Sequence, residues 1–259
     1  MQIDKNMQPD ICLFNLCIPL YPFCVATGFL IGTIVATFLG KKNNISENQV
    51  FVLICFVEVG VIIGGKILFL LVNINNIHKI IEAFGFIALF TKTGFVFYGG
   101  LFGGLLLFFI GNRVLKLKIT KTLPLIITVT PLIHAFGRLG CFCAGCCYGK
   151  EWNKTFGVFI NGEFRFPVQL LESFANLILF FILLSVFIYI SNFQIFIIPI
   201  YFIGYGIIRL ITESFRGDIT RGQIGFLSIS SWLSILSITV GIIYTIKELL
   251  NMRKGTNNE

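Results

Sequence analysis

The chain contains seven apolar runs, most of them long enough to cross a lipid bilayer as a helix. A spanning helix needs roughly 20 apolar residues, because an α-helix advances about 1.5 Å per residue through a hydrocarbon core about 30 Å thick. No water reaches backbone groups there, so such runs must be helical. The sequence therefore predicts an all-α polytopic membrane protein. The predicted spans, to within several residues, are 19–40, 50–73, 94–112, 122–140, 168–190, 196–212 and 225–247.

Composition supports a membrane location. Apolar residues make up 56% of the chain and charged residues 12%, whereas about 25% of a soluble domain is charged. The net charge of +8 fits basic cytoplasmic loops and anionic lipid better than nucleic acid, and we expect no nucleic-acid partner. The first residues are polar and no small-residue cleavage site follows the first apolar run, which predicts a retained helix. No repeat or low-complexity linker is evident, so we expect one domain, 1–259.

Lysine and arginine predict the orientation of the spans. Short basic loops are usually cytoplasmic, which predicts an N-terminus outside, a C-terminus inside, and outer loops at 74–93, 141–166 (the longest polar stretch) and 213–224. The basic residues that fall on the inner side are Lys41, Lys42, Arg113, Lys116, Lys118, Lys121, Lys247, Arg253 and Lys254.

Under this topology the unusual polar residues converge on the outer half of the membrane. Arg138 ends the fourth span, and a guanidinium at membrane depth costs at least ~2.5 kcal/mol, so it is usually paired or faces a polar cavity. Arg209 and Glu213 lie one turn apart on one face of the sixth span. The same region receives residues from three further places: Arg216 after the sixth span, Gln169 and Glu172 at the start of the fifth, and Tyr98, Gly99 and Gly100 early in the third.

Four clustered cysteines follow Arg138, namely Cys141, Cys143, Cys146 and Cys147. They could form a disulfide on an oxidising outer face, a metal site, or small packing residues in a glycine-framed turn. The spacing C-x-C-x-x-C-C crowds metal ligands and lacks the usual second pair. We therefore favour packing or a disulfide, and expect no metal and no cofactor. The other cysteines are interpreted as ordinary thiols: Cys12, Cys17, Cys24 and Cys55.

In order and spacing, these residues resemble the prolipoprotein diacylglyceryl transferase family. Gly137-Arg138-Leu139-Gly140 matches its Gly-Arg-x-Gly signature, and the resemblance runs from Tyr21 to the last span. The other segments that resemble family motifs are Val61-Ile-Ile-Gly-Gly-Lys66, Phe97-Tyr98-Gly99-Gly100, Arg165-Phe166-Pro167-Val168-Gln169-Leu170-Leu171-Glu172, Tyr205-Gly206-Ile207-Ile208-Arg209 and Glu213-Ser214-Phe215-Arg216.

The chain departs from the family wording at four positions. The signature continues in the family as Asn-Phe-x-Asn-Gly-Glu, and here Cys141, Ala144 and Cys146 take the asparagine, asparagine and glutamate positions. Tyr98 stands where many members carry histidine. These departures, which mark a cysteine-rich branch, concern proton transfer and thiol activation more than lipid binding.

The resemblance implies that diacylglyceryl moves from phosphatidylglycerol to the lipobox cysteine of a prolipoprotein signal peptide. A thioether forms and glycerol phosphate leaves. Arg138 would hold the lipid phosphate, since arginine stays charged and binds phosphate through a rigid fork. Arg209 would stabilise the leaving group or the substrate thiolate, or else form a structural ion pair with Glu213. Tyr98 is a further catalytic candidate, although tyrosine is a poor base near neutral pH.

The remaining site residues would contact substrate, and Glu172 and Gln169 would orient the arginines. His134, one turn before Arg138, is interpreted as a packed or hydrogen-bonded helix residue, with proton transfer as the alternative. The expected substrate-binding residues are Arg138, Tyr21, Gly99, Gly100, Gln169, Glu172, Tyr205, Glu213 and Arg216.

Taken together, the resemblance implies about seven helices around a lipid cavity that faces the outer leaflet of a bacterial inner membrane. The expected partners are phosphatidylglycerol, prolipoprotein signal peptides and membrane lipids. Two alternatives stay open: a related phospholipid-headgroup transferase with a different thiol acceptor, and a non-enzymatic membrane protein that uses its cysteine cluster.

Overall fold

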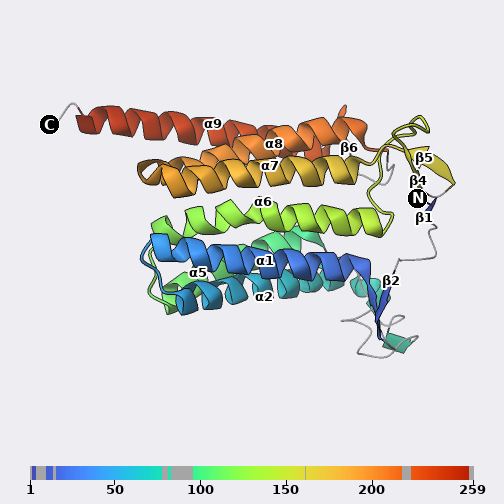
Figure 1. Ribbon diagram of the computed structural model, residues 1–259, viewed down its shortest axis with the longest axis horizontal. Helices are drawn as coiled ribbons and strands as arrows, with labels where there is room; N and C mark the ends of the chain where they lie inside the picture. Colours follow the sequence, from blue (N-terminus) through green and yellow to red (C-terminus); the bar gives the residue numbers. More distant parts are fainter. Residues whose placement is uncertain are drawn as a thin grey trace. The chain divides into compact units, whose positions relative to one another are not determined.

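The computed structural model describes residues 2–3, 10–13, 16–77, 81–82, 96–160, 162–217 and 223–256 (Figure 1). Within these ranges, seven helices are long and apolar enough to cross a membrane. Each matches one predicted span, which confirms the all-α polytopic fold class. The helices are α1 (Leu20–Lys42), α2 (Glu47–Val72), α5 (Phe97–Val114), α6 (Ile119–Cys143), α7 (Val168–Tyr189), α8 (Ile197–Phe215) and α9 (Ile229–Thr256).

Short elements that the sequence analysis did not predict join these helices. Two are 3-10 helices, η1 (Ile74–Asn76) and η2 (Ser191–Phe196). The strands have two to four residues each, too few for a readable hydropathy pattern. They are β1 (Gln2–Ile3), β2 (Asp10–Leu13), β3 (Leu16–Pro19), β4 (Val158–Ile160), β5 (Glu163–Arg165), β6 (Gln223–Ile224) and β7 (Leu227–Ser228).

The strands form three small sheets. β1 pairs in parallel with β4, which pairs antiparallel with β5, and the hairpins β2–β3 and β6–β7 are separate. Most of the predicted 74–93 outer loop, together with Asp218 and Arg221 of the predicted 213–224 loop, lies outside the described residues.

The chain divides into two compact units. The first unit comprises Met1–Val35 and Leu123–Glu259, and the second comprises Ala36–Thr122. The expectation of a single domain stays a prediction.

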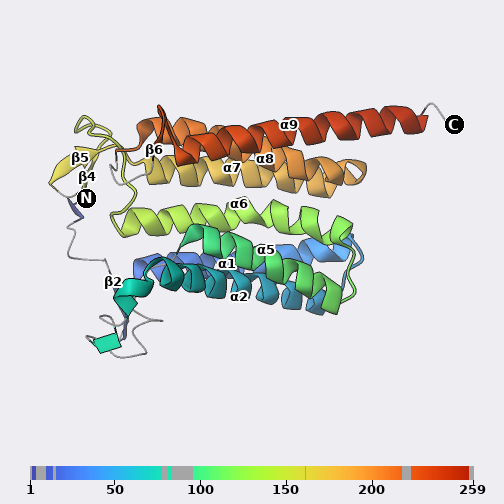
Figure 2. The same ribbon diagram turned by 180° about the vertical axis from the view of Figure 1, so that it is seen from behind.

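In the second unit, α2 and α5 lie side by side because glycines on both helices face each other (Figure 2). A Cβ added to Gly64 would lie 2.3 Å from the carbonyl oxygen of Gly99, and one added to Gly60 would lie 2.3 Å from that of Gly103. Small residues four apart allow such close contact between membrane helices. The facing glycines of α2 and α5 therefore form a helix-packing surface.

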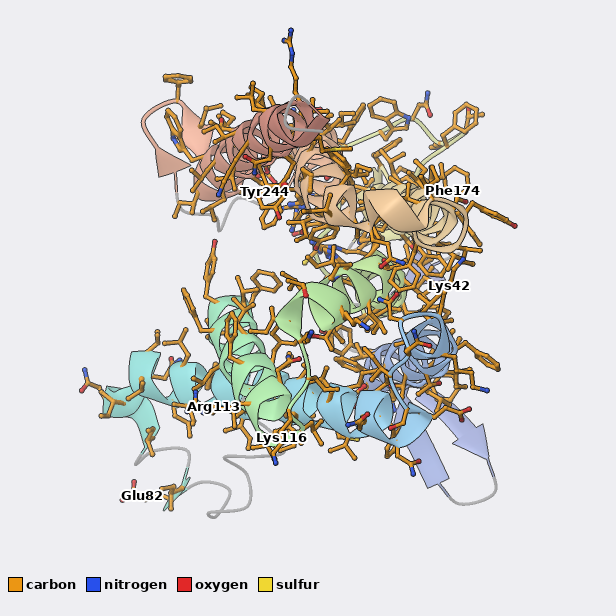
Figure 3. All side chains as sticks on the ribbon, turned by 90° about the vertical axis from the view of Figure 1, so that its left-hand side faces the viewer. Lys42, Glu82, Arg113, Lys116, Phe174 and Tyr244 are labelled. Carbon is orange, nitrogen blue, oxygen red and sulfur yellow. The ribbon has the colours of Figure 1, made fainter. Side chains whose placement is uncertain are left out.

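The basic loops of the second unit gather at one end of that unit. Lys121 donates from Nζ to the carbonyl of Asn43 at 3.2 Å, and the Asn43 amide donates to the carbonyl of Lys121 at 3.0 Å. Figure 3 shows Lys42, Arg113 and Lys116 at the end that faces the viewer. The predicted grouping of these lysine and arginine residues on one side is thus confirmed within this unit.

In the first unit, α7, α8 and α9 lie side by side (Figures 1 and 2). Gly206 of α8 contacts α9, since an added Cβ would lie 2.6 Å from Ile238 Cγ1. Gly28 of α1 contacts Phe136 of α6 in the same way, at 2.7 Å. Large apolar side chains cover the outer faces, and Phe174, labelled in Figure 3, is 64% exposed. Such surfaces suit lipid rather than water.

Candidate active site

A buried carboxylate, Glu172, links three helices of the first unit. It lies in the second turn of α7, and its side chain is 1% exposed. Nη2 of Arg138, on α6, lies 3.0 Å from Glu172 Oε1, and Nη1 of Arg209, on α8, lies 3.2 Å from Glu172 Oε2. A buried charge is very costly unless it is paired. The expected contact of Glu172 with both arginines is therefore present.

Every nitrogen of the Arg209 guanidinium has a partner. Nη1 donates to Glu172, and Nη2 donates to Glu213 Oε2 at 3.0 Å. Nε and Nη2 also donate to the hydroxyl of Ser230, at 3.1 and 2.6 Å. Because Ser230 lies in the first turn of α9, Arg209 joins α7, α8 and α9. These contacts hold the guanidinium in one orientation.

Arg138 differs from Arg209 because one of its hydrogen-bond donors has no partner among the described residues. Its Nε is buried and has no hydrogen-bond partner among the described residues. An unpaired buried donor costs about 1–3 kcal/mol, and native structures rarely leave one without a reason. A bound anion would supply that missing acceptor. Of the two arginines that contact Glu172, Arg138 is thus the better candidate to take a phosphate.

The segment after α6 is fixed by backbone hydrogen bonds to the residues before α7 and at the end of α8. Gly149 N–H donates to the carbonyl of Phe166 at 3.1 Å, and Lys150 N–H donates to that of Phe215 at 2.8 Å. A Cβ on Gly149 would lie only 2.4 Å from the Phe166 oxygen, so this position requires glycine. Gly149 also forms a β-bridge with Arg216, which brings Arg216 beside the preceding cysteine turn.

Three of the clustered cysteines meet in that turn. The Sγ atoms of Cys141, Cys146 and Cys147 all lie within 4.8 Å of one another. Cys143 instead forms a hydrogen bond with Cys24 of α1. Cys141, Cys143, Cys146 and Cys147 are all free thiols, so the disulfide expected as one alternative does not form among these four in this structure.

The two cysteines beyond the end of α6 have opposite pKa shifts. Hydrogen bonds from Cys141 and then from Cys146 lower the pKa of Cys147, and the positive charges of Arg216 and Arg138 act in the same direction. Hydrogen bonds with Cys141 and then with Cys147 raise the pKa of Cys146. Cys147 is therefore the thiol of the cluster that most readily becomes a thiolate.

Gln169 has a different partner from the one expected. Its Nε2 donates to the backbone carbonyl of Cys146 at 2.7 Å, and its side chain is almost completely buried. It therefore fixes the cysteine turn onto α7, and no described contact joins it to an arginine. Its Oε1 is buried and lacks a hydrogen-bond partner among the described residues.

Comparison with known proteins gives a consistent assignment. The family model for prolipoprotein diacylglyceryl transferase matches residues 11–247. The chain is 34% identical over 242 residues to the phosphatidylglycerol--prolipoprotein diacylglyceryl transferase of Clostridium tetani, a match that covers 89% of this chain and 93% of the relative. It is 29% identical over 239 residues to the enzyme of the same name from Finegoldia magna, covering 91% and 93%. The chain belongs to the prolipoprotein diacylglyceryl transferase family.

Two tyrosines at family-motif positions lie in the first unit with the ion pairs. Tyr21 of α1 contacts the signature glycine, since its Cδ2 lies 3.1 Å from a Cβ built on Gly140. Tyr205 of α8 stacks on Tyr201, with ring centroids 5.7 Å apart, and its ring centroid lies 5.2 Å from that of His134. Their roles toward substrate remain predictions.

The family's His-Gly-Gly position lies in the second unit. Tyr98 is 41% exposed and forms an edge-to-face contact with Phe97 at 5.7 Å. Gly99 contacts Gly64 of α2, which gives it a packing function, and Gly100 is buried on the same helix. A site role for these three residues stays a prediction.

Sequence reasoning missed one part of the network. Ser230 supplies the hydroxyl that accepts from Arg209, and the segment Ser228-Ile229-Ser230-Ser231 gives no sign of this because hydroxyls are common in membrane helices. His134, one turn before Arg138, was interpreted as a packed or hydrogen-bonded helix residue, with proton transfer as the alternative. Its Nε2 lies 3.8 Å from Glu172 Oε1, which places it beside the network.

Proposed function

We propose that the protein transfers the diacylglyceryl group of phosphatidylglycerol to the thiol of the lipobox cysteine of prolipoproteins. The observation that carries this proposal is the pair of Arg138 with the buried Glu172, in which Arg138 Nε has no hydrogen-bond partner among the described residues. Family membership supports the reaction type. A multi-pass fold with an arginine cluster at helix ends suits a donor that is itself a membrane lipid.

In this reaction the acceptor sulfur attacks the glyceryl carbon that bears the phosphate. The C–S bond forms, the C–O bond breaks, and its electron pair leaves on a phosphate oxygen of glycerol phosphate. The thiol gives up its proton before or during attack, because the thiolate is the nucleophile. The site must therefore hold a phosphate, stabilise its growing charge and favour a thiolate.

We assign these tasks to different residues. Arg138 binds the phosphodiester and then the leaving phosphate through its free Nε. Arg209 acts through Glu172, which it holds in place, and this favours the positioning alternative for Arg209 over direct contact with substrate. Arg216 adds positive charge beside the cysteine turn. Tyr21, Tyr205 and Tyr98 are proposed contacts for the headgroup or the glycerol oxygens.

We place the protein in the bacterial inner membrane with its N-terminus outside and its C-terminus in the cytoplasm. The basic end of the second unit then faces the cytoplasm, in agreement with the positive-inside rule. In this orientation the start of α7 and the end of α6 lie toward the outer leaflet, where exported prolipoproteins present their signal peptides.

The test is complementation of a bacterial strain depleted of its own diacylglyceryl transferase. Wild type should restore lipidation of a tagged prolipoprotein, whereas Arg138→Lys should lower it by about 10²-fold or more, because lysine keeps the charge but loses the fork that binds phosphate. The matched control is Arg113→Lys, at an exposed arginine on α5 of the second unit. Membrane levels of each variant are measured by blotting.

Failure of well-inserted wild type to restore lipidation would refute the proposal. Equal rescue by Arg138→Lys and wild type would remove Arg138 from the phosphate-binding role and leave the reaction assigned.

A second candidate is transfer to a different thiol acceptor, such as a small thiol. Cysteines at the family's asparagine and glutamate positions favour it, because acceptor activation must differ there. Phosphatidylglycerol labelled in its headgroup distinguishes the two candidates. Release of glycerol phosphate that depends on a lipobox peptide supports prolipoprotein transfer, whereas release with a small thiol alone supports the second candidate.

A further inference from the structure

The cysteine turn has the geometry of a three-thiolate metal site. A tetrahedral zinc with Zn–S bonds of about 2.3 Å places its sulfur ligands about 3.8 Å apart. The Sγ atoms of Cys141, Cys146 and Cys147 already lie within 4.8 Å of one another. Side-chain rotations that shorten these distances by about 1 Å would complete the ligand set.

The fold removes the crowding that the sequence spacing suggested. Cys143 forms a hydrogen bond with Cys24 of α1 and is not one of the three proposed ligands. The ligands therefore follow the pattern C-x-x-x-x-C-C. Gly145 has a φ of 62°, and the chain then turns again at Cys147, which has a φ of 57°. A non-glycine residue in this region is strained, and such strain concentrates at functional sites. Here the strained residue supplies one of the three sulfurs.

The surroundings suit a cluster of thiolates. Three thiolates and a divalent cation carry a net charge of −1, which falls to −2 when a fourth thiolate binds. The positive charges of Arg138 and Arg216 act on this turn and would stabilise part of this negative charge. Gln169 donates a hydrogen bond to the backbone carbonyl of Cys146 and so fixes the turn. Residues that hydrogen-bond around metal ligands orient those ligands in the same way.

We propose that Cys141, Cys146 and Cys147 bind a zinc ion whose fourth position takes the thiolate of the acceptor cysteine. This inference rests on the proposed function. Three protein ligands with one open position are typical of catalytic zinc, whereas structural sites have four. Cys146 is exposed, so the cluster is open to an incoming ligand.

The site would activate the acceptor thiol. A thiol bound to zinc is deprotonated outright, so the acceptor loses its proton to solvent on binding. Its sulfur then attacks the glyceryl carbon, the C–S bond forms and the C–O bond breaks. The electron pair of the C–O bond leaves with glycerol phosphate. The substitution needs no external oxidant or reductant. The thioether product is neutral and therefore a weaker zinc ligand than the thiolate, so it dissociates from the ion.

Soft thiolate ligands select zinc over magnesium, calcium or manganese. Phosphate, by contrast, is held by Arg138 in the proposed function. The two substrates would thus be bound by different groups that lie next to each other, the donor by arginine and the acceptor by the metal.

The experiment uses the full chain, purified anaerobically in lipid nanodiscs without chelators. We expect about one zinc per chain by elemental analysis of wild type and of the control Cys143→Ser. Cys141→Ser, Cys146→Ser and Cys147→Ser should each lose most of it. Cobalt exchanged into the site should give sulfur-to-cobalt charge-transfer bands, and a lipobox peptide with cysteine, but not one with serine, should shift the d–d bands.

Activity provides a second readout. Removal of zinc should lower transfer by about 100-fold or more, with recovery on adding zinc back. Metal-free wild type with full transfer activity would overturn the zinc inference and leave the proposed function intact. Bound zinc with a peptide-dependent cobalt shift, but no transfer, would support the site and refute the proposed reaction. A disulfide in the turn, or zinc retained equally by all three serine variants, would overturn the site.

Discussion

Arg138 Nη2 lies 3.0 Å from Glu172 Oε1, and Glu172 is buried between helices that each bring a cation to it. Arg138 and Arg209 share this carboxylate, while Glu213 pairs with Arg209 and Arg216 lies beside the cysteine turn. Three arginines and two glutamates leave one positive charge. A phosphodiester carries one negative charge, so the unliganded network matches the charge of a phosphatidylglycerol headgroup.

Removal of the shared carboxylate should destabilise the protein. Glu172→Gln keeps the shape but removes the carboxylate that pairs with Arg138 and leaves Arg209 with Glu213 alone, and loss of one partner of a buried ion pair costs about 3–5 kcal/mol. We expect lower thermal stability in nanodiscs and loss of transfer. The control is Glu163→Gln. The Glu163 carboxylate is half-exposed and pairs with Arg165, and loss of such an exposed ion pair costs about 0–1 kcal/mol. Equal stability of the two variants would contradict the importance of the buried pair.

Ser230→Ala tests the positioning of Arg209. The hydroxyl accepts from two nitrogens of the guanidinium, and hydrogen bonds to charged groups contribute about 1.5–3 kcal/mol. We expect transfer to fall by about 10-fold or more with little change in the amount of inserted protein. Steady-state kinetics with labelled phosphatidylglycerol measure the change. Ser185→Ala is the control, because that hydroxyl donates within its own helix to Phe181 at 2.8 Å.

The helices and one ion pair could be predicted from the sequence because both depend on local spacing. Hydropathy over about 20 residues determines a membrane helix, and each of the seven predicted spans matches a helix. Arg209 and Glu213 are four residues apart on one helix, so their 3.0 Å contact follows from helix geometry. The pairing of Glu172 with the arginines was expected from the cost of a buried carboxylate.

Other contacts depend on how distant segments meet, which sequence spacing does not determine. Nothing local indicates that Cys143 contacts Cys24 while its neighbours Cys146 and Cys147 join Cys141. Gln169 and Ser230 were equally hidden, because a single amide or hydroxyl can bond to many partners. The short strands were missed because two to four residues carry too little pattern.

Gly64→Ala should separate α2 from α5. The added Cβ would lie 2.3 Å from the carbonyl oxygen of Gly99 and 2.9 Å from Cα of Gly103, and these backbone atoms cannot move away independently. We expect lower thermal stability or reduced insertion, measured by a melting assay and membrane blotting. Gly137→Ala is the matched control, because a Cβ there meets nothing within 4 Å, and alanine favours helix over glycine by about 1 kcal/mol. Equal loss in both variants would contradict the packing argument.

Cys147 should react as a thiolate at a pH where ordinary cysteine is protonated. Hydrogen bonds from Cys141 and Cys146 hold its pKa below the usual range, so a larger fraction of Cys147 is thiolate at a given pH than in an ordinary cysteine. In reduced, metal-free protein, its alkylation by iodoacetamide should therefore rise by clearly less than tenfold per pH unit between pH 6 and 8. An ordinary thiol, with a pKa near 8.5, gains about tenfold per pH unit below that pKa. Peptide mass spectrometry after timed labelling locates the modified residue. This weakly pH-dependent labelling should vanish in Cys147→Ser and persist in Cys143→Ser, and a tenfold rise per pH unit at Cys147 would show that its pKa is not lowered.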